Sequence, residues 1–223
     1  MDEKINKTIG VILSGSGWQD GSEIHESVLT LYNLDKEGVK TKIFAPDENQ
    51  TDVVHHISQE QDNSHNRNVM VESARIARGE ISPLNDADAN KLDGLVIPGG
   101  FGVAKNLCNY ASKGSNMSVD NTISNLILDI HEQNKPLGFI CISPVIAAKV
   151  LEKFKPKLTV GNDEKTINDV EKMGAQHIEA SVDEIVFDET NNIVTTPAYM
   201  LGPSIAYVGK GISKLAKKVV ELA

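Results

Sequence analysis

The chain has 223 residues, a formal net charge of −9 and a hydrophobic content of 40%. This composition is typical of a globular protein with a buried core, and an acidic balance without a basic block argues against nucleic-acid binding. No apolar stretch approaches the roughly 20 residues that a membrane-spanning helix needs, and the N-terminal residues do not read as a signal peptide. With only two cysteines, we expect free thiols in a reducing, cytoplasmic setting.

Strands and helices are predicted to alternate along the chain. β-branched or continuous apolar runs predict strands, and apolar residues spaced by three and four predict helices. A strand, helix, strand order forms a βαβ unit, which builds parallel sheets. We therefore predict an α/β fold with a doubly wound, mostly parallel sheet and helices on both faces. The first elements are a strand at 8–14, a helix at 23–38, a strand at 40–47, a strand at 92–100, a helix at 119–135 and a strand at 137–140.

The remaining segments continue this pattern without a linker. Residues 48–92 form a longer excursion that includes a predicted helix at 68–79. A hairpin with Asn191-Asn192 at its turn is expected within 184–198, and a closing helix covers 204–223. Since no repeat or low-complexity segment marks a boundary, residues 1–223 are expected to form a single domain.

Three unusual loops follow the predicted strands. They are SGSGWQDGSE at 14–23, PGGFG at 98–102 and CISP at 141–144. In an open parallel sheet, ligands bind at the carboxyl ends of the strands. None of these loops is GxGxxG or a P-loop, so nucleotide binding is not favoured.

Cys141 lies where a buried strand turns into a helix. A cysteine is often core filler, but the positive end of a helix dipole stabilises a thiolate. A sharp turn there would act as a nucleophile elbow. Cys108, between Leu107 and Tyr110 on an apparent helix, is interpreted as packing.

Backbone amides and a carboxylate are expected beside Cys141. Gly99 and Gly100 can expose N–H groups that, with the N–H of Ile142, would form an oxyanion hole. Glu23 follows the first loop and should project toward the same sheet edge, where it could act as acid or base. A Glu in the first helical turn can also simply complement the dipole.

His25 and Glu26 are alternative candidates for the acid–base role of Glu23. Because each helical residue turns by about 100°, we expect both to be partly exposed. The histidines lack metal-ligand spacing, so no metal site is predicted. A histidine from residues 48–92 folding over the site remains open as an alternative.

The segments in this order resemble a known family. DGSEIHE, FAPD, VIPGGFG, PLGFICISP and IVTTPAYML are similar to the ThiJ/PfpI group of the class I glutamine-amidotransferase-like superfamily. Within it they resemble the ElbB group, whose name (enhancing lycopene biosynthesis) links it to isoprenoid biosynthesis. The resemblance implies a flavodoxin-like fold, Cys141 as nucleophile and Glu23 as its partner.

The resemblance also implies an activity. The group is similar to glutathione-independent glyoxalases, cofactor-free lyases that convert glyoxal or methylglyoxal to a hydroxy acid. A small aldehyde or dicarbonyl substrate and a homodimer are expected by resemblance, with no nucleic-acid or membrane partner. Ile142 stands where many relatives have His, and VTTPAYM lacks the late His-x-Glu of glutaminases, so a glutaminase is not expected.

Two other readings remain open. The chain could be a redox-responsive accessory or regulatory protein that supports isoprenoid biosynthesis or stress tolerance, with Cys141 as its sensor. It could also be a catalytically idle member of the fold, because fold alone does not imply function.

Overall fold

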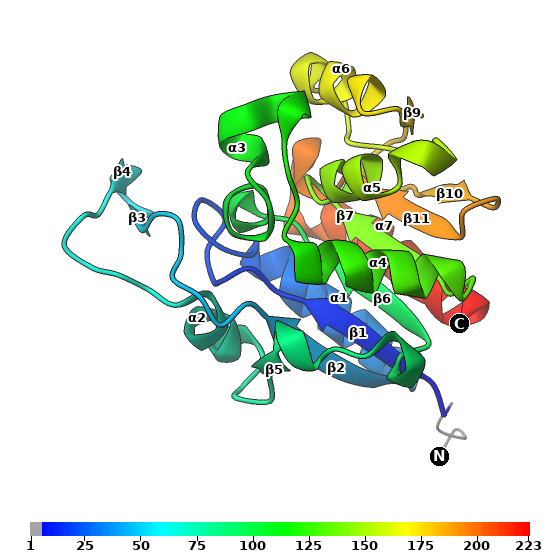
Figure 1. The fold of residues 1–223 in the computed structure, drawn as a ribbon, viewed down its shortest axis with the longest axis horizontal. Helices are drawn as coiled ribbons and strands as arrows, with labels where there is room; N and C mark the ends of the chain where they lie inside the picture. The colour runs from blue at the N-terminus through cyan, green and yellow to red at the C-terminus, as the bar shows by residue number, and fades with distance from the viewer. Residues whose placement is uncertain (1–5) are drawn as a thin grey trace.

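The computed structural model describes residues 6–223, and a mostly parallel sheet forms its centre (Figure 1). Within these residues, seven strands lie in the order β10-β11-β7-β6-β1-β2-β5. Only the β10–β11 pair is antiparallel among the pairs of this sheet. The strands are β1 (Thr8–Ile12), β2 (Lys40–Ala45), β5 (Ser82–Pro83), β6 (Gly94–Ile97), β7 (Leu137–Ile140), β10 (Val186–Asp188) and β11 (Ile193–Thr196).

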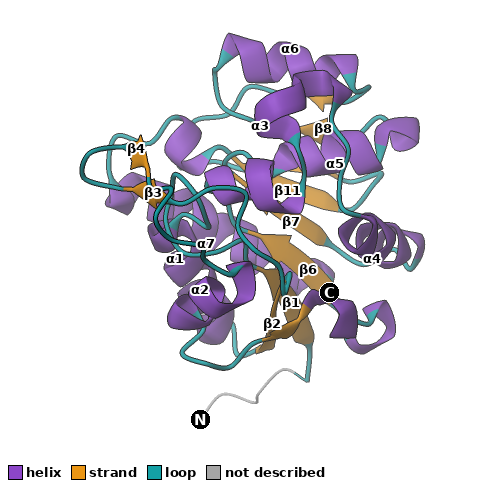
Figure 2. Cartoon of the chain, turned by 60° about the vertical axis from the view of Figure 1, so that its left-hand side comes forward, coloured by secondary structure: helices purple, strands orange, loops and turns teal. Residues whose placement is uncertain are grey.

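Helices enclose this sheet on both faces (Figure 2). Helices α1 and α7 pack together on one face, with α2 beside α1, while α4 and α5 pack on β6 and β7 from the other. The helices are α1 (Ile24–Lys36), α2 (Val69–Ile76), α3 (Tyr110–Lys113), α4 (Asn121–Glu132), α5 (Pro144–Val150), α6 (Glu164–Lys172) and α7 (Ile205–Leu222). A π-helix covers Val103–Leu107. The predicted doubly wound fold is confirmed.

Burial explains why these segments form these elements. Every residue of β6, β7 and β11 is buried, as expected for central strands covered on both faces. Helix α4 buries Ile123, Leu126, Ile127 and Ile130, the apolar positions that predict it as amphipathic.

Four short strands lie outside the main sheet. β3 (Val54–His55) and β4 (Glu60–Gln61) form an antiparallel hairpin, and β8 (Lys157–Leu158) pairs in parallel with β9 (Gln176–His177). The β3–β4 hairpin projects from the body of the molecule (Figure 1). It belongs to the 48–92 excursion, which returns through α2 to place β5 at the edge of the sheet. No helix among residues 6–223 has the length and apolar character to cross a bilayer.

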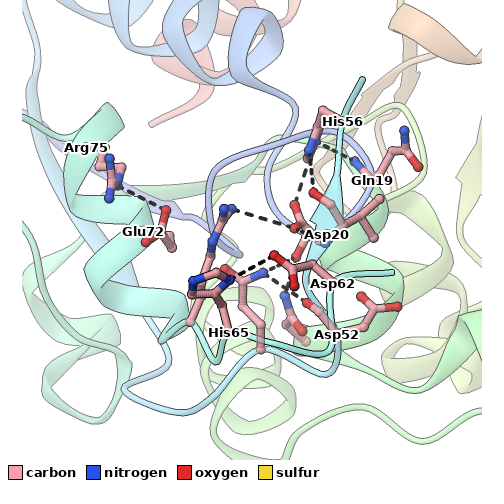
Figure 3. A network of polar contacts seen from close by, with 12 residues as sticks. Gln19, Asp20, Asp52, His56, Asp62, His65, Glu72 and Arg75 are labelled. Carbon is pink, nitrogen blue, oxygen red and sulfur yellow. Dashed lines mark hydrogen bonds and ion pairs between the residues drawn. The ribbon is translucent and has the colours of Figure 1, made fainter. Parts of the chain in front are cut away.

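Residues 52–67 contain the β3–β4 hairpin and are called the arm below. Asp20 attaches the arm to the loop after β1 (Figure 3). Its buried Oδ2 accepts the Val54 N–H at 2.8 Å. His56 Nε2 lies 3.8 Å from Asp20 Oδ1, and Arg67 Nη1 lies 3.9 Å from Oδ2. Lys105 adds a second connection, an ion pair in which its Nζ lies 2.9 Å from Asp52 Oδ2. The arm is therefore held by charged contacts at its base.

The strand order reverses between β1 and β6. From β1 the chain proceeds through β2 to β5 on one side, and from β6 through β7 to β11 on the other. The carboxyl ends of β1 and β6 are therefore the point at which sheets of this kind usually bind ligands. The loop after β7 lies beside it.

Candidate active site

Cys141 occupies a sharp turn between β7 and α5. Its φ is 64°, in the left-handed region that non-glycine residues seldom adopt. Its N–H still donates to the Thr196 carbonyl at 3.0 Å, so strand pairing continues up to the turn. Such a strained residue persists only when its surroundings fix it, and this kind of strain is common at active sites. The expected elbow is present, although the residue is only 8% exposed.

Ser143 holds the elbow in place. Its hydroxyl donates to the Ile97 carbonyl at the end of β6 at 2.7 Å. The same oxygen accepts the Ile140 N–H at 2.7 Å. Ser143 thereby connects the turn both to the end of β6 and to the last residue of β7. Sequence reasoning did not identify Ser143.

Glu23 does not provide the carboxyl beside Cys141. It is the N-cap of α1, and its Oε2 accepts the Glu26 N–H at 2.7 Å. Glu26 instead is fully buried beside Cys141: a β-carbon at Gly99 would stand 2.5 Å from Glu26 Oε2 and 3.0 Å from the Cys141 sulfur. The expectation that Glu26 is partly exposed is wrong, because the helix begins at Ile24 and its inward face is formed by Glu26, Thr30 and Leu34.

Backbone amides hold both oxygens of the Glu26 carboxyl. Oε2 accepts the Gly99 N–H at 2.9 Å, and Oε1 accepts the Tyr199 N–H at 3.2 Å. Glu26 therefore joins the β6 loop, the turn after β11 and the elbow. Tyr199 follows Ala198, whose φ of 43° turns this segment inward.

Burial dominates the protonation of this pair. It raises the pKa of Glu26 to about 8, and the nearby Glu23 charge adds to that rise. Burial, followed by the Glu26 carboxyl, also raises the pKa of the Cys141 thiol well above its usual range, while the Gly100 and Ile142 amides act in the opposite direction. At neutral pH both groups hold their protons. As the pH rises through about 8 the Glu26 carboxyl loses its proton, while the raised pKa of the Cys141 thiol keeps that group protonated.

The glycines let the loops meet this closely. A β-carbon at Gly99 would stand 2.5 Å from both the Cys141 β-carbon and Glu26 Oε2. One at Gly100, whose φ is 102°, would stand 2.3 Å from the Glu23 nitrogen. No side chain fits at either position.

The three backbone amides predicted for the oxyanion hole, those of Gly99, Gly100 and Ile142, do not all interact with the same group. The N–H groups of Gly100 and Ile142 oppose the rise that burial causes in the pKa of the Cys141 thiol. The Gly99 N–H donates to Glu26 instead. An oxyanion hole formed by the Gly100 and Ile142 amides therefore stays a prediction.

The other cysteine and the histidines lie elsewhere. Cys108 is buried, its thiol donates to the Val103 carbonyl at 3.2 Å, and burial raises its pKa to about 12, in agreement with a packing role. It follows the π-helix in extended backbone rather than lying within a helix. His56 contacts Asp20, and His25 Nδ1 lies 2.7 Å from the Tyr199 hydroxyl. Among residues 6–223, no three His, Cys, Asp or Glu side chains are grouped to hold a metal ion.

One signal in the sequence could have identified Glu26. Glu23 and Glu26 are three residues apart, the spacing of an N-cap and the third residue of its helix. That spacing assigns Glu23 to the cap and turns Glu26 toward the core. Tyr199 gave no such signal, because it acts through its backbone N–H.

Known proteins are similar to this chain over nearly its whole length. No family model matches it. The human glutamine amidotransferase-like class 1 domain-containing protein 3, mitochondrial, is 38% identical over 96% of this chain and 82% of its own length. A crystal structure of an isoprenoid biosynthesis protein with amidotransferase-like domain from Ehrlichia chaffeensis aligns with a TM-score of 0.90 and 37% identity, covering 97% of this chain and 100% of that one.

More distant structures share the fold alone. Drosophila melanogaster DJ-1beta aligns with a TM-score of 0.54 at 19% identity, covering 98% of this chain and 96% of its own. This likeness agrees with the predicted ThiJ/PfpI-type architecture.

The curated relatives correct one expectation and establish the family. The expected cytoplasmic setting is wrong, since the human relative and the ES1 proteins of rat and zebrafish are all named as mitochondrial. A low cysteine count indicates reduced thiols and does not distinguish between reducing compartments. By its identity to these proteins and the share of their length that it spans, the chain belongs to the family of ES1 and glutamine amidotransferase-like class 1 domain proteins.

Proposed function

We propose that this protein is a glutathione-independent glyoxalase that converts glyoxal, and methylglyoxal, to the corresponding hydroxy acid. One observation carries the proposal: the buried Glu26 carboxyl and the Cys141 thiol of a strained elbow both lie against the glycine at position 99. Such a pair provides a nucleophile and an acid–base group at one place. In this proposal Glu26 takes the role that sequence reasoning gave to Glu23.

The proposed reaction needs no external oxidant. Once Glu26 has ionised, its carboxylate takes the thiol proton as the Cys141 sulfur adds to one aldehyde carbon, and it then returns that proton to the new oxygen, giving a hemithioacetal and restoring the carboxylate. The Gly100 and Ile142 amides stabilise the oxyanion that precedes it. Glu26 then moves the proton on that carbon to the neighbouring carbon through an enediol, which leaves a thioester. Water cleaves the carbon–sulfur bond, releasing glycolate and restoring the thiol.

A glutaminase is not part of the proposal. Ile142 follows the nucleophile, and its side chain cannot act as a base. The turn after β11 presents Tyr199, whose hydroxyl lies 2.7 Å from the exposed His25. The carboxyl on the thiol therefore has to supply acid–base chemistry.

Measuring glycolate from glyoxal tests the proposal directly. Purified protein without added thiol should form glycolate, and Cys141→Ala should abolish the product. Glu26→Gln should lower kcat by about 10²-fold or more, the usual contribution of a positioned acid–base group. Cys108→Ala, which removes the other thiol, is the matched control and should retain activity. Glycolate formation by Cys141→Ala at the wild-type rate would refute the assignment.

A redox-responsive accessory role is the second candidate. It is favoured by the protonated Glu26 carboxyl, which can donate a hydrogen bond to an oxygen added to Cys141. A thiolate attacks peroxide to give a sulfenic acid, and a second peroxide gives the sulfinate. This role predicts selective sulfinate formation at Cys141 and a change in a partner's affinity. Unchanged binding after oxidation would contradict it.

Three further parts of the proposal concern organisation. We propose that residues 1–223 form a single domain of this type and, from the names of the curated relatives, that the protein is mitochondrial. We also propose a homodimer, which is supported by an exposed apolar stripe on α1 formed by Ile24, Val28 and Tyr32. Analytical ultracentrifugation tests the dimer: Val28→Glu should shift the wild-type protein to monomer, and a wild-type monomer would exclude it.

A further inference from the structure

Aromatic residues gather around the Cys141–Glu26 pair. Only 4% of the chain is aromatic. Yet Phe101 directly follows Gly100, the Trp18 carbonyl accepts the Phe101 N–H, and the Tyr199 N–H donates to the Glu26 carboxyl. This concentration requires an explanation beyond core packing, since Trp18 and Phe101 are 44% and 47% exposed.

Trp18 and Phe101 form the first aromatic group. Phe101 follows Gly99 and Gly100, and a β-carbon at Gly99 would stand 3.0 Å from the Cys141 sulfur. The Phe101 N–H donates to the Trp18 carbonyl at 2.8 Å, and the two ring centroids are 6.1 Å apart with a tilt of 51°. The predicted oxyanion amide of Gly100 and this pair of exposed rings are therefore parts of one loop contact.

Tyr199 and His25 form the second group. The Tyr199 N–H holds Glu26, and its ring centroid lies 5.8 Å from that of His25. Aromatic residues are thus part of both the loop after β6, which packs against Cys141, and the turn after β11, which holds the Glu26 carboxyl.

The loop that carries Trp18 is rigidly held. Gly17 and Gly21 close it through N–H donation from Gly21 to the Gly17 carbonyl at 2.7 Å. The next residues, Gln19 and Asp20, are tied to Lys105 and the arm, as Figure 3 shows for Asp20. A ring presented by a fixed loop loses little freedom when a ligand packs on it, which favours binding.

We propose that this site selects substrates with a flat aromatic substituent, namely aryl-substituted 2-oxoaldehydes. The inference rests on the proposed function and names its substrate class. The aldehyde carbon adds the Cys141 sulfur, its hydrogen moves to the adjacent ketone carbon, and water releases an aryl hydroxy acid. The aryl group packs against Trp18 and Phe101, where tilted or offset rings attract each other. Glyoxal has no group to make this contact.

The only tryptophan in the chain is Trp18, so intrinsic fluorescence reports on the proposed contact. Titration with mandelate, the aryl product, and with glycolate, the unsubstituted product, compares the two classes without turnover. We expect mandelate to bind about tenfold more tightly, the fold-change that one aromatic contact supplies. Phe101→Ala should remove most of this preference, and Phe101→Leu tests the ring while keeping an apolar side chain.

Phe154→Ala is the matched control, since Phe154 is 45% exposed and stacks on His131, away from this loop. It should retain the preference. Equal affinity for mandelate and glycolate, or an unchanged preference in both Phe101 variants, would overturn the inference. Glyoxal turnover without a preference for mandelate would overturn the inference about aromatic substrates and leave the proposed glyoxalase reaction in place. Tighter mandelate binding without turnover of glyoxal or phenylglyoxal would overturn the proposed reaction and keep the aromatic site.

Discussion

Replacing Glu26 with Gln should change how the stability of the protein depends on pH. Burial raises the pKa of Glu26 from its ordinary value of 4.5 to about 8 in the folded state. Between these two values the folded protein binds more protons than the unfolded chain, so its stability falls as the pH rises. Glu26→Gln has no proton to bind at this position and escapes that loss.

The magnitude follows from the width of the pH window. Each pH unit in which one state holds the proton and the other does not is worth about 1.4 kcal/mol. From pH 5.5 to 7.5 the stability of Glu26→Gln should therefore rise by about 2 to 3 kcal/mol relative to wild type. At pH 5.5 the variant should start out less stable by about 1 to 3 kcal/mol, because one amide oxygen cannot accept from both Gly99 and Tyr199.

Urea denaturation of both proteins at several pH values measures this difference, and other titrating groups cancel in it. Glu23→Gln is the control. It removes a carboxyl three residues earlier that caps the helix, and it should keep most of the wild-type slope. A constant difference between wild type and Glu26→Gln from pH 5.5 to 7.5 would refute the conclusion that Glu26 holds a proton at neutral pH.

Three other perturbations probe the site and its supports. Alkylation of Cys141 by iodoacetamide, followed by mass spectrometry, should stay slow at neutral pH and accelerate only above the usual range of a free thiol, because burial and the Glu26 carboxyl raise the pKa of the Cys141 thiol; fast alkylation at neutral pH would contradict this. Gly100→Ala should destabilise the protein by more than Gly79→Ala in thermal melts. Both positions have positive φ, which costs about 1 to 3 kcal/mol for alanine, but only Gly100 would also place a β-carbon against backbone. Asp20→Ala should cost about 1 to 3 kcal/mol by leaving the buried Val54 N–H without an acceptor, and should speed hydrogen exchange at that amide; unchanged exchange would show that Asp20 does not hold the arm.

The fold was predictable because its signals repeat along the chain. The strand 137–140 and the helix 119–135 each carry several residues of one periodicity, and the structure places β7 and α4 there. The meeting of three loops followed from the parallel topology, which aligns their strands' carboxyl ends. Each of these predictions rests on several residues of one element, so a boundary misplaced by one residue does not change the predicted element.

The partner of Cys141 depended on a single position. Whether Glu23 or Glu26 faces the core is decided by where α1 begins, and helix ends are the least certain boundaries. Burial of a carboxyl also runs against expectation, since charged residues are seldom fully buried without partners. Here the partners are two backbone amides and a thiol from distant segments. No pattern within a single segment of the sequence predicts that groups from distant segments meet around one carboxyl.

The two edges of the main sheet limit how copies of the protein can associate. At one edge β5 has only two residues, and one of them, Pro83, has no N–H to donate to another strand. At the other edge β10 has three residues and lies against β8. Short, interrupted edges resist the addition of strands from another chain, and so protect against sheet-to-sheet aggregation. Association through a helical face, such as the apolar stripe on α1, would leave the sheet and the elbow after β7 undisturbed.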